Sequence, residues 1–390
     1  MSSKQSPKIL FLTNWYPTKE NPAGSIFVHE HALALKSAGA DVTIIRIAAK
    51  KSTNFILEKE IERYQKDGIQ VLSVFLKSRF SDVINANWWY LWRVLKTVIS
   101  DKLSGHKIDY VHSNVIYPAA FLGHKLAKEL RKPHYITEHW TNLKWVFNKP
   151  YYQKIGKEVY KKADAVFPVS DFLANQIEGY AGKEVHTVVV PNVVNPNIFK
   201  YSERSHTNKT KFLCVTNFWL AKKKSHKRPD VLIEAINLLP KTIQSKMELV
   251  FIGRGGGQEH LKEYVNKLNL ECDIIFLGGQ PKEIIAKRMQ EAHFLLQATE
   301  RETFGVVLAE AMSTGLPCIV SELAVLKELV HQKNGVFVPT NTPQDWAKVI
   351  SSAVDGQLRF NNKEISEAIQ HKFAYKTIGE MYLSETLRQT

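Results

Sequence analysis

Cysteine is scarce in this chain of 390 residues, and recognisable metal-binding motifs are missing. Cys214, Cys272 and Cys318 lie far apart, so their spacing matches neither a disulfide scaffold nor a zinc or redox motif. The histidines also lack metal-ligand spacing, and there is no Asp-x-Asp sequence to hold a divalent cation. We therefore expect buried thiols in a reducing compartment such as the cytoplasm, with no metal site and no resident cofactor.

Long apolar runs are also absent. No stretch approaches the roughly 18–20 apolar residues that cross a bilayer as a helix. The N-terminal run ILFL has four apolar residues, too few for the core of a signal peptide. Together with a hydrophobic content of 44%, this indicates a soluble globular protein, and the length predicts two domains.

Acidic residues are outnumbered, which gives the chain a formal net charge of +15. Residues 1–200 carry 28 Lys and Arg against 17 Asp and Glu, and residues 201–250 carry 10 against 4. Residues 251–390 are nearly balanced, with 15 against 17. A basic first half can attract phosphorylated small molecules, anionic lipid or nucleic acid, and charge alone does not choose among them.

Short apolar runs alternate with helical patterns along the chain, which is typical of doubly wound parallel α/β domains. Residues 196–210 are polar and show no periodicity, so we expect an interdomain linker there. The sequence thus predicts one Rossmann-like domain over residues 1–195 and a second over residues 211–370. A helical pattern over residues 371–390 either docks on the second domain or crosses back to the first.

Residues 300–322, ERETFGVVLAEAMSTGLPCIVSE, place two glutamates around an apolar helical pattern. A helix ending near Gly315 puts Glu310 on an apolar face and leaves Glu302 in the preceding loop. The backbone N–H groups at the start of such a helix favour an anion. A nucleotide-sugar fits this pattern, with its diphosphate at the helix tip and its hydroxyls at the two carboxylates. The alternative is structural, with Glu302 stabilising the helix start and Glu310 bonding nearby backbone.

This E-x7-E run resembles the signature of the retaining family-4 glycosyltransferases, which have the GT-B fold. WYPTKENPAGSIFVHEHALALKSAGADVTII is similar to that family's opening strand, glycine loop and first helix. The runs YITEHW, KKADAVFPVSDFL, VVVPNVVN, KRPDVLIEA, ELVFIGRGGG and IIFLGGQ follow in the family's order, so the resemblance covers nearly the whole chain.

The resemblance implies transfer of a sugar from a nucleotide diphosphate to an acceptor hydroxyl, with the anomeric configuration retained and without a metal. The donor, a UDP- or GDP-linked hexose or N-acetylhexosamine, would bind mainly to the C-terminal domain and the acceptor mainly to the N-terminal one. The basic first half suits a phosphorylated or lipid-linked acceptor, as in bacterial surface polysaccharide or lipopolysaccharide assembly.

Matched residue by residue, the resemblance assigns roles around the expected helix. Glu302 would contact hydroxyls of the transferred sugar, and Glu310 would bind the ribose. The backbone N–H groups of Phe304, Gly305 and Val306 would face the diphosphate.

Four further residues are implied outside that helix. Lys227, in KRPD, would neutralise the leaving phosphate, and His139, in YITEHW, would meet the donor sugar near the reacting carbon. Gly24 would let backbone approach the diphosphate from the first domain. Gly253 begins the loop GRGGGQ, which follows a strand and is expected near the nucleotide.

The chain departs from the family pattern in the basic side chains expected on the phosphates. Asn217 stands where the family usually has an arginine, and an amide supplies no charge. The basic run AKKKSHKR, which contains Lys222, Lys223, Lys224, Lys227 and Arg228, is expected to compensate. A second departure is Val193, which stands where the family usually has a glycine.

Residues 85–103, NANWWYLWRVLKTVISDKL, combine three tryptophans with basic side chains. Such a helix either contacts an anionic membrane, lines the acceptor cleft, or packs on the sheet. Three alternative functions stay open: a GT-B sugar-nucleotide epimerase, a basic module that binds nucleic acid, and a degenerate transferase that binds without turnover. No nucleic-acid motif is present, so nucleic acid is not an expected partner.

Overall fold

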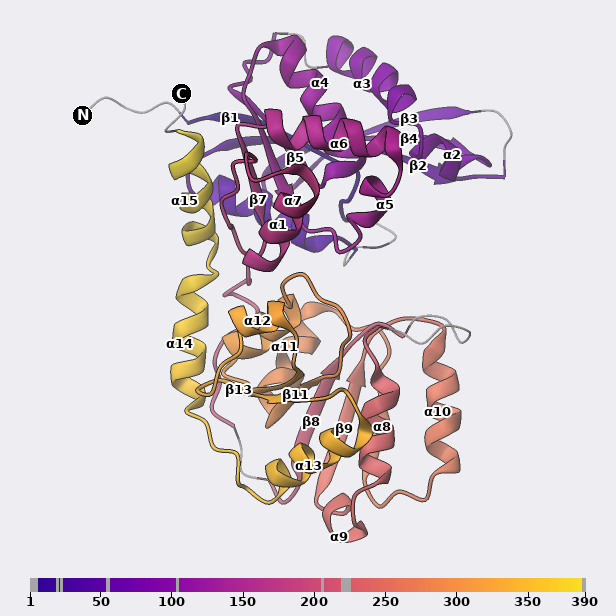
Figure 1. Cartoon of the computed structure of the whole chain (residues 1–390), viewed down its shortest axis with the longest axis vertical. Helices are drawn as coiled ribbons and strands as arrows, with labels where there is room; N and C mark the ends of the chain where they lie inside the picture. Colours follow the sequence, from indigo (N-terminus) through magenta and orange to yellow (C-terminus); the bar gives the residue numbers. More distant parts are fainter. Residues whose placement is uncertain are drawn as a thin grey trace, which may run out of the picture. The chain divides into compact units, whose positions relative to one another are not determined.

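The structure, a computed structural model, forms two compact units. The first unit comprises residues 1–193 and 375–390, and the second comprises residues 194–374. Figure 1 shows that each unit is a sheet covered by helices. The residues that the structure describes are 6–18, 21, 24–53, 57–102, 105–204, 207–218 and 226–387.

The first unit alternates strands and helices, as the hydrophobic pattern predicts. Its strands are β1 (Lys8–Thr13), β2 (Asp41–Lys51), β3 (Glu58–Lys66), β4 (Ile69–Ser78), β5 (Tyr110–Asn114), β6 (His134–Glu138) and β7 (Ala165–Pro168). Its helical segments are α1 (Ile26–Ser37), α2 (Ser81–Asn85), α3 (Trp88–Lys102), η1 (Ile116–Ala120), α4 (Phe121–Leu130), α5 (Lys144–Phe147), α6 (Pro150–Lys162), α7 (Asp171–Ala181) and α15 (Tyr375–Thr386).

The sheet of the first unit has the strand order β3-β4-β2-β1-β5-β6-β7. Its strand pairs are parallel except β3 with β4, which is antiparallel. Strand β3 reads EKEIERYQK and lies at the edge of the sheet, where charged side chains are usual, so apolar periodicity does not detect it. The strand order reverses direction between β1 and β5. In doubly wound sheets, ligands bind beyond the carboxyl ends of the strands at such a point.

Helix α15 belongs to the first unit and packs against α1. Gly379 permits this close approach, because a Cβ there would lie 2.0 Å from the carbonyl oxygen of Ala34. Tyr375 donates its hydroxyl to the buried carboxylate of Glu30 on α1. Of the two dockings open to the C-terminal pattern, the structure therefore has residues 375–386 on the first unit.

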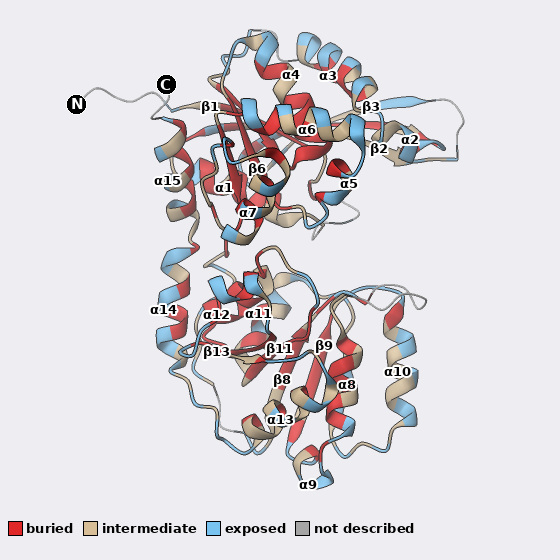
Figure 2. Ribbon diagram, viewed as in Figure 1, coloured by how far each residue is buried: buried red, intermediate tan, exposed pale blue. Residues whose placement is uncertain are grey.

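The second unit repeats the architecture with an all-parallel sheet in the order β10-β9-β8-β11-β12-β13. In Figure 2 its central strands are largely buried, whereas the helix over residues 257–267 is intermediate or exposed along nearly its whole length. The order reverses between β8 and β11. The strands are β8 (Thr210–Val215), β9 (Met247–Ile252), β10 (Asp273–Phe276), β11 (Phe294–Gln297), β12 (Cys318–Ser321) and β13 (Gly335–Val338). The helical segments are α8 (Pro229–Asn237), α9 (Lys241–Gln244), α10 (Gly257–Lys267), α11 (Lys282–Glu291), α12 (Val306–Ser313), η2 (Ala324–Glu328), α13 (Pro343–Val354) and α14 (Asn362–Lys372).

The segment expected as a linker, residues 196–210, instead packs on the second unit where it is described. Phe199 is fully buried, and its carbonyl accepts a hydrogen bond from the Ser313 hydroxyl at 2.8 Å. The Arg204 guanidinium donates to the carbonyl of Ala292 at 2.7 Å and to that of Thr314 at 3.3 Å. These contacts join residues distant in sequence, so local polarity does not reveal them. The structure accordingly divides the units after Val193 and again before Tyr375.

The two folds together confirm the predicted class, two doubly wound Rossmann-like domains. Among the described residues, no helix has both the length and the apolar content to cross a bilayer.

Candidate active site

Helix α12 begins at Val306, with Gly305 as its N-cap. Gly305 has φ of 91°, a left-handed conformation that favours glycine. The amides of Leu308 and Ala309 both donate to the Gly305 carbonyl, at 2.9 and 3.2 Å, and so start the helical ladder. The amides before them have no intrahelical acceptor and make the helix tip favourable for an anion. Phe304 is buried, with its ring edge-on to Phe373 at 5.5 Å between centroids.

Glu302 lies in the loop between β11 and α12 and forms an ion pair with Lys227. The two side chains are only 17% and 16% exposed, so their charges are partly desolvated and interact more strongly than a surface pair. The second carboxylate oxygen accepts from the Thr303 amide at 3.3 Å. Two predicted site residues that are 75 positions apart therefore meet next to the start of α12.

Glu310 lies on α12 and is buried, with Lys282 as an ion-pair partner at 3.0 Å. Lys282 is the first residue of α11, and its ammonium also lies 5.6 Å from the ring centroid of Phe199. Sequence reasoning missed Lys282. Its position on a helix start just after β10, at the carboxyl edge of the parallel sheet, was the available signal. The carboxylate pair at this helix is thus matched by a pair of lysines.

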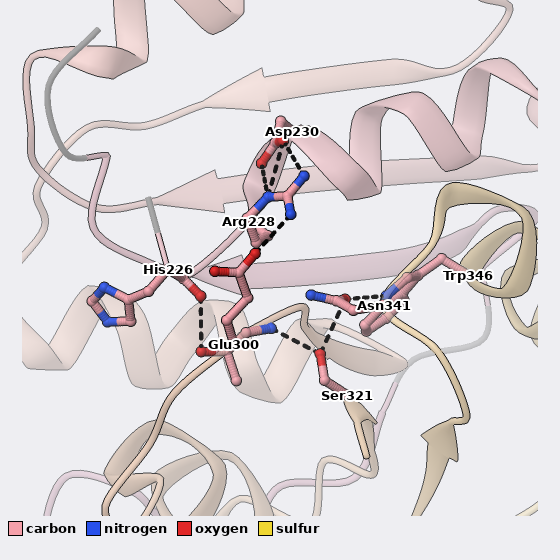
Figure 3. Close-up of polar contacts among 8 residues, drawn as sticks. His226, Arg228, Asp230, Glu300, Ser321, Asn341 and Trp346 are labelled. Atoms are coloured by element: carbon pink, nitrogen blue, oxygen red, sulfur yellow. Dashed lines mark hydrogen bonds and ion pairs between the residues drawn. The ribbon is translucent and has the colours of Figure 1, made fainter. Parts of the chain in front are cut away.

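Arg228 is held between two carboxylates and does not extend the set of predicted phosphate ligands. Figure 3 shows its guanidinium between Asp230 and Glu300. The hydrogen bonds to Asp230 are 2.8–3.1 Å long, and the one to Glu300 is 2.8 Å. These partners raise the pKa of Arg228 and already balance its charge. Of the other lysines expected to compensate for Asn217, Lys222, Lys223 and Lys224 lie outside the described residues.

Backbone contacts fasten the segment that carries Lys227 to the loop that carries Glu302. The His226 carbonyl accepts from the Glu300 amide at 2.7 Å and from the Thr299 hydroxyl at 3.2 Å. Lys227 directly follows His226, and Glu302 follows Glu300 after one residue. The Lys227–Glu302 pair is therefore positioned by the main chain as well as by charge.

A second polar cluster fixes the end of β11 to the neighbouring strand and helix. The Thr299 amide donates to the Ser321 hydroxyl at 2.8 Å. Ser321 donates to Asn341 at 3.1 Å, and the same amide oxygen accepts from the Trp346 indole at 2.8 Å (Figure 3). Trp346 is fully buried in the core of the second unit, so the loop that enters α12 starts from a rigid base.

Asn217 and Gly253 follow β8 and β9 and lie in adjacent loops. The Phe218 amide donates to the Arg254 carbonyl at 2.8 Å, and the Thr216 amide to the Ile252 carbonyl at 2.8 Å. A Cβ at Gly253 would lie 1.7 Å from the Thr216 carbonyl oxygen, so only glycine allows these loops to approach so closely. Asn217 is exposed at the carboxyl edge of the sheet.

In the first unit, His139 follows β6 and is buried, with 8% of its surface exposed. The Asn114 side-chain amide nitrogen lies 3.1 Å from Nε2 of His139, so Asn114 donates and the imidazole proton resides on Nδ1. That Nδ1 has no hydrogen-bond partner among the residues that the structure describes. Burial lowers the pKa of His139 well below its usual value, and the nearby His31 lowers it further, so the ring is neutral.

Glu138, directly before His139, fixes the backbone of this turn. Its carboxylate is fully buried and accepts from the amides of Ile116, His139 and Trp140 at 2.7–2.9 Å. The Tyr160 hydroxyl donates a fourth bond at 2.8 Å. Burial raises the pKa of Glu138 to about 7, against the opposing effect of these donors. Sequence reasoning missed Glu138 because its donors come from three separate segments.

Gly24 lies next to Ser25, the N-cap of α1, and its amide donates to the Asn21 carbonyl at 3.1 Å. A Cβ there would lie 2.3 Å from the amide nitrogen of the Asn21 side chain, so the turn is compact at this point. The described residues bring no group of three His, Cys, Asp or Glu side chains together as metal ligands.

Comparison with known proteins matches both halves of the chain to glycosyltransferase families. A model described as "Glycosyl transferases group 1" matches residues 200–371, and one described as "Glycosyltransferase Family 4" matches residues 24–198. An uncharacterized glycosyltransferase of Methanocaldococcus jannaschii is 26% identical over 281 residues, which are 70% of this chain and 75% of the relative.

Solved structures show the same fold. Sucrose-phosphate synthase from Thermosynechococcus elongatus superimposes with a TM-score of 0.76 at 16% identity, over 98% of each chain. Anabaena HepE in complex with UDP gives a TM-score of 0.71 at 18% identity, over 98% of this chain and all of that one. The two matched models leave little of the sequence unassigned, and this protein therefore belongs to the group 1 glycosyl transferases, with a family 4 N-terminal region and the GT-B fold.

Proposed function

We propose that this glycosyltransferase moves a hexose or N-acetylhexosamine from a UDP- or GDP-sugar to an acceptor hydroxyl, with retention and without a metal. The observation that carries the proposal is the pair of Lys–Glu contacts at α12. Lys227–Glu302 lies beside the helix start and Lys282–Glu310 lies along the helix. Such an arrangement offers carboxylates to sugar hydroxyls and cations to phosphate around one anion-binding helix tip.

In the proposed complex the diphosphate lies at the N–H groups of Phe304, Gly305 and Val306. Glu310 accepts from the ribose hydroxyls, and Glu302 accepts from hydroxyls of the transferred sugar. Lys227 and Lys282 then shift part of their contact from the carboxylates to phosphate oxygens. Asn217 and Gly253 border the nucleotide from the loops that follow β8 and β9. Gly24, which belongs to the first unit, borders the diphosphate. HepE was solved with UDP, which makes UDP-sugars the first donors to test.

The reaction breaks the bond between the anomeric carbon and the phosphate oxygen and forms a bond from the acceptor oxygen on the same face. The acceptor proton passes to the departing phosphate oxygen, so no enzymic nucleophile is required. Charge that develops on the diphosphate is stabilised by the helix N–H groups and by Lys227. Nδ1–H of His139, which makes no hydrogen bond of ordinary geometry among the described residues, is the donor that we assign to a hydroxyl of the transferred sugar.

Donor identity is tested by thermal shift with UDP-, GDP- and ADP-sugars. A bound donor at 100 times its Kd raises stability by about 2.7 kcal/mol, so the correct base should raise Tm clearly above the others. No shift with any nucleotide-sugar contradicts the proposal. Donor incubated alone also separates the alternatives, because an epimerase changes the sugar without an acceptor and a transferase releases nucleotide only slowly to water.

The assigned residues are tested by Glu302→Gln and Lys227→Ala. We expect each to lower the transfer rate about 100-fold, the usual order for loss of one group that stabilises transition-state charge. Lys227→Ala should act mainly on kcat, since its contact is strongest as the phosphate departs. Lys209→Ala is the matched control, because it removes a lysine whose carboxylate partner, Asp273, is exposed. Wild-type transfer by both site variants, with circular dichroism unchanged, would overturn these assignments.

We further propose that the first unit contacts an anionic phospholipid surface through exposed apolar side chains near α2, α3 and α6. Phe80, Val83, Trp89 and Tyr151 are 50–66% exposed. The ammonium of Lys125 lies 3.6 Å from the Trp89 ring centroid. The hydroxyl of Tyr152 bonds the carbonyl of Ala86 at 2.6 Å, which joins the starts of α6 and α3. Aromatic rings beside lysines suit the headgroup region of an anionic bilayer, where a lipid-linked surface-glycan acceptor would be presented.

Co-sedimentation with vesicles tests this contact. Binding should occur with phosphatidylglycerol-rich vesicles, weaken with salt, and fall in Trp89→Ala and Tyr151→Ala. Leu238→Ala is the control, because Leu238 is 51% exposed on the second unit. Equal binding by all three variants, or equal binding to pure phosphatidylcholine, would refute the assigned surface.

A further inference from the structure

A chain of buried hydrogen bonds crosses the first unit from the sheet to the C-terminal helix. His112 Nε2 lies 2.7 Å from the Thr137 hydroxyl, which lies 2.9 Å from the Tyr382 hydroxyl. Tyr382 in turn lies 2.7 Å from Nδ1 of His31, and Nε2 of His31 lies 3.1 Å from the side-chain oxygen of Asn192. All five side chains are buried, so water does not offer these groups alternative partners.

The direction of each bond follows from the acceptor at the end of the chain. The Asn192 oxygen can only accept, so His31 carries its proton on Nε2. Burial lowers the pKa of His31 to about 4, so the ring is neutral and its Nδ1 must accept from Tyr382. A hydroxyl has one hydrogen, and Tyr382 therefore accepts from Thr137. Thr137 likewise accepts from Nε2–H of His112, and every proton in the chain has one position.

One member of this hydrogen-bond network, His31, packs against His139. The rings of His31 and His139 pack edge to face, with centroids 4.9 Å apart and planes at 68°. Phe27 covers His139 from another direction at 4.8 Å, and Asn114 bonds its Nε2. The orientation of His139 is therefore bounded by these three neighbours and by the side chain of Asn192. Of the four, His31 and Asn192 are bonded to each other, and His31 is also bonded to Tyr382.

We propose that Tyr382 is a positioning residue for the reaction, which holds His31 in a single orientation and through it aims Nδ1–H of His139. The proposal rests on the proposed role of His139. It assigns the C-terminal helix a part in the chemistry beyond its packing on α1. The hydroxyl is the decisive group, because Tyr382→Phe keeps the ring contacts with His31, His112 and Phe167 and removes only the bonds to His31 and Thr137.

A purely structural role is the competing explanation, since Tyr382 also anchors α15. A second tyrosine on the same helix, Tyr375, offers a matched control. Tyr375 donates its hydroxyl to Glu30 on α1, outside the hydrogen-bond network that contains His31 and Tyr382. Tyr375→Phe and Tyr382→Phe each delete one tyrosine hydroxyl from the α1–α15 interface, and Tyr375 is half-buried whereas Tyr382 is buried. A structural role predicts the same outcome for both variants, namely a lower Tm without a specific change at His139.

The first readout is the histidine side-chain signals in long-range ¹H–¹⁵N spectra of ¹⁵N-histidine protein, assigned for His139 by their loss in His139→Ala. We expect His139 signals to shift or broaden in Tyr382→Phe and to stay in place in Tyr375→Phe. Unchanged His139 signals in both variants would overturn the proposal. This measurement needs no substrate, so its result is independent of which sugar nucleotide the protein uses.

The second readout is the slow hydrolytic turnover of the donor without acceptor, measured as UDP release from UDP-glucose with wild-type and variant proteins. We expect kcat of Tyr382→Phe to fall about tenfold with KM unchanged, a smaller loss than the ~100-fold that a 1 Å misplacement can cause. Tyr375→Phe should keep the wild-type kcat. Equal kcat for the two variants at a temperature where both are folded would assign Tyr382 to structure alone.

A double-mutant cycle separates this proposal from the proposed function. If Tyr382 acts through His139, Tyr382→Phe should have no further effect on kcat in a His139→Ala background. Additive losses would refute the positioning role while leaving His139 in the reaction. Wild-type kcat in His139→Ala would instead remove His139 from the proposed function, and the spectra would still report whether Tyr382 orients it.

Discussion

The two units place different kinds of polar groups at the carboxyl edges of similar sheets. In the first unit the groups are neutral and buried: His139, His31, Asn114 and Asn192 have a single arrangement of protons. In the second unit they are charged and paired, with lysines on Glu302 and Glu310. A neutral network can aim a group but cannot easily exchange partners. Ion pairs keep charges in place and can exchange them for those of a ligand.

The variant with the largest expected effect tests whether the polar groups at the carboxyl edge of the first unit's sheet depend on the buried Glu138. Glu138→Gln replaces a carboxylate that accepts four bonds with an amide that turns N–H groups toward two of the same donors. We expect a loss of about 3 kcal/mol in the free energy of unfolding, because at least one buried backbone donor loses its acceptor. Urea unfolding measures this loss. A change below about 1 kcal/mol would show that the turn does not need the carboxylate.

Acidification should destabilise the first unit more than the second. Burial lowers the pKa of His31 to about 4 and that of His112 to about 3, whereas both titrate near 6.5 when unfolded. The unfolded chain binds more protons between these values, so the stability they confer is complete above pH 6.5 and is lost as pH falls toward 4. Glu138 acts in the opposite sense, since its raised pKa of about 7 favours folding as pH falls from 7 to 4.5.

The histidines outnumber that single acid, and we expect a net loss of about 2 kcal/mol in the first unit by pH 5. Hydrogen exchange followed by mass spectrometry resolves the units. Peptides from β5, β6 and α15 should lose protection at a higher pH than those from β8 and β9. Simultaneous loss in both units would contradict the assignment of acid sensitivity to the buried histidines.

Lys282→Met tests the paired charges at the carboxyl edge of the second unit's sheet. Methionine keeps an apolar stem near Phe199 but removes the cation 3.0 Å from the buried Glu310. We expect a loss of about 1–2 kcal/mol, less than for a fully buried pair because Lys282 is 20% exposed. Exchange protection should fall in α11 and α12 and stay unchanged in the first unit. No measurable loss would mean that Glu310 is held by its other surroundings.

The smallest effect comes from an ion pair outside either edge. Lys162 and Glu158 are an exposed i,i+4 pair on α6. Lys162→Ala should change the free energy of unfolding by less than about 0.5 kcal/mol in urea titration, because solvent and salt screen such pairs. If Lys162→Ala lowered the free energy of unfolding as much as Lys282→Met, ion pairs at the carboxyl edge of the sheet would not be stronger than ion pairs on the surface.

Sequence patterns predicted those features of the molecule that are determined by residues close together in the sequence. Apolar alternation predicted the two doubly wound domains, and the spacing of Glu302 and Glu310 predicted one glutamate before a helix and one on it. The same patterns did not find β3, whose polar residues lie at a sheet edge, or the packing of Phe199 on the second unit.

The partners of the site residues were the least predictable part. Lys282 meets Glu310 only because β10 and β11 end at the same edge of a sheet. Tyr382 bonds His31 although the two residues are 351 positions apart. The periodicity of the helix that carries Tyr382 does not show on which unit this helix docks. The donors of Glu138 come from η1, from the end of its own strand and from α6. Such contacts are set by tertiary packing, which local spacing does not encode.

Helix α15 has a consequence for how the protein is made. The ribosome completes residues 194–374 before it reaches Tyr375, so the second unit can fold while the first still lacks one of its helices. Until residue 382 emerges, Nδ1 of His31 and the hydroxyl of Thr137 have no tyrosine to bond, and the backbone of α1 at Ala34 lacks its close contact with Gly379. Translation therefore delays the closing of the first unit's interior until after residues 194–374 have been synthesised.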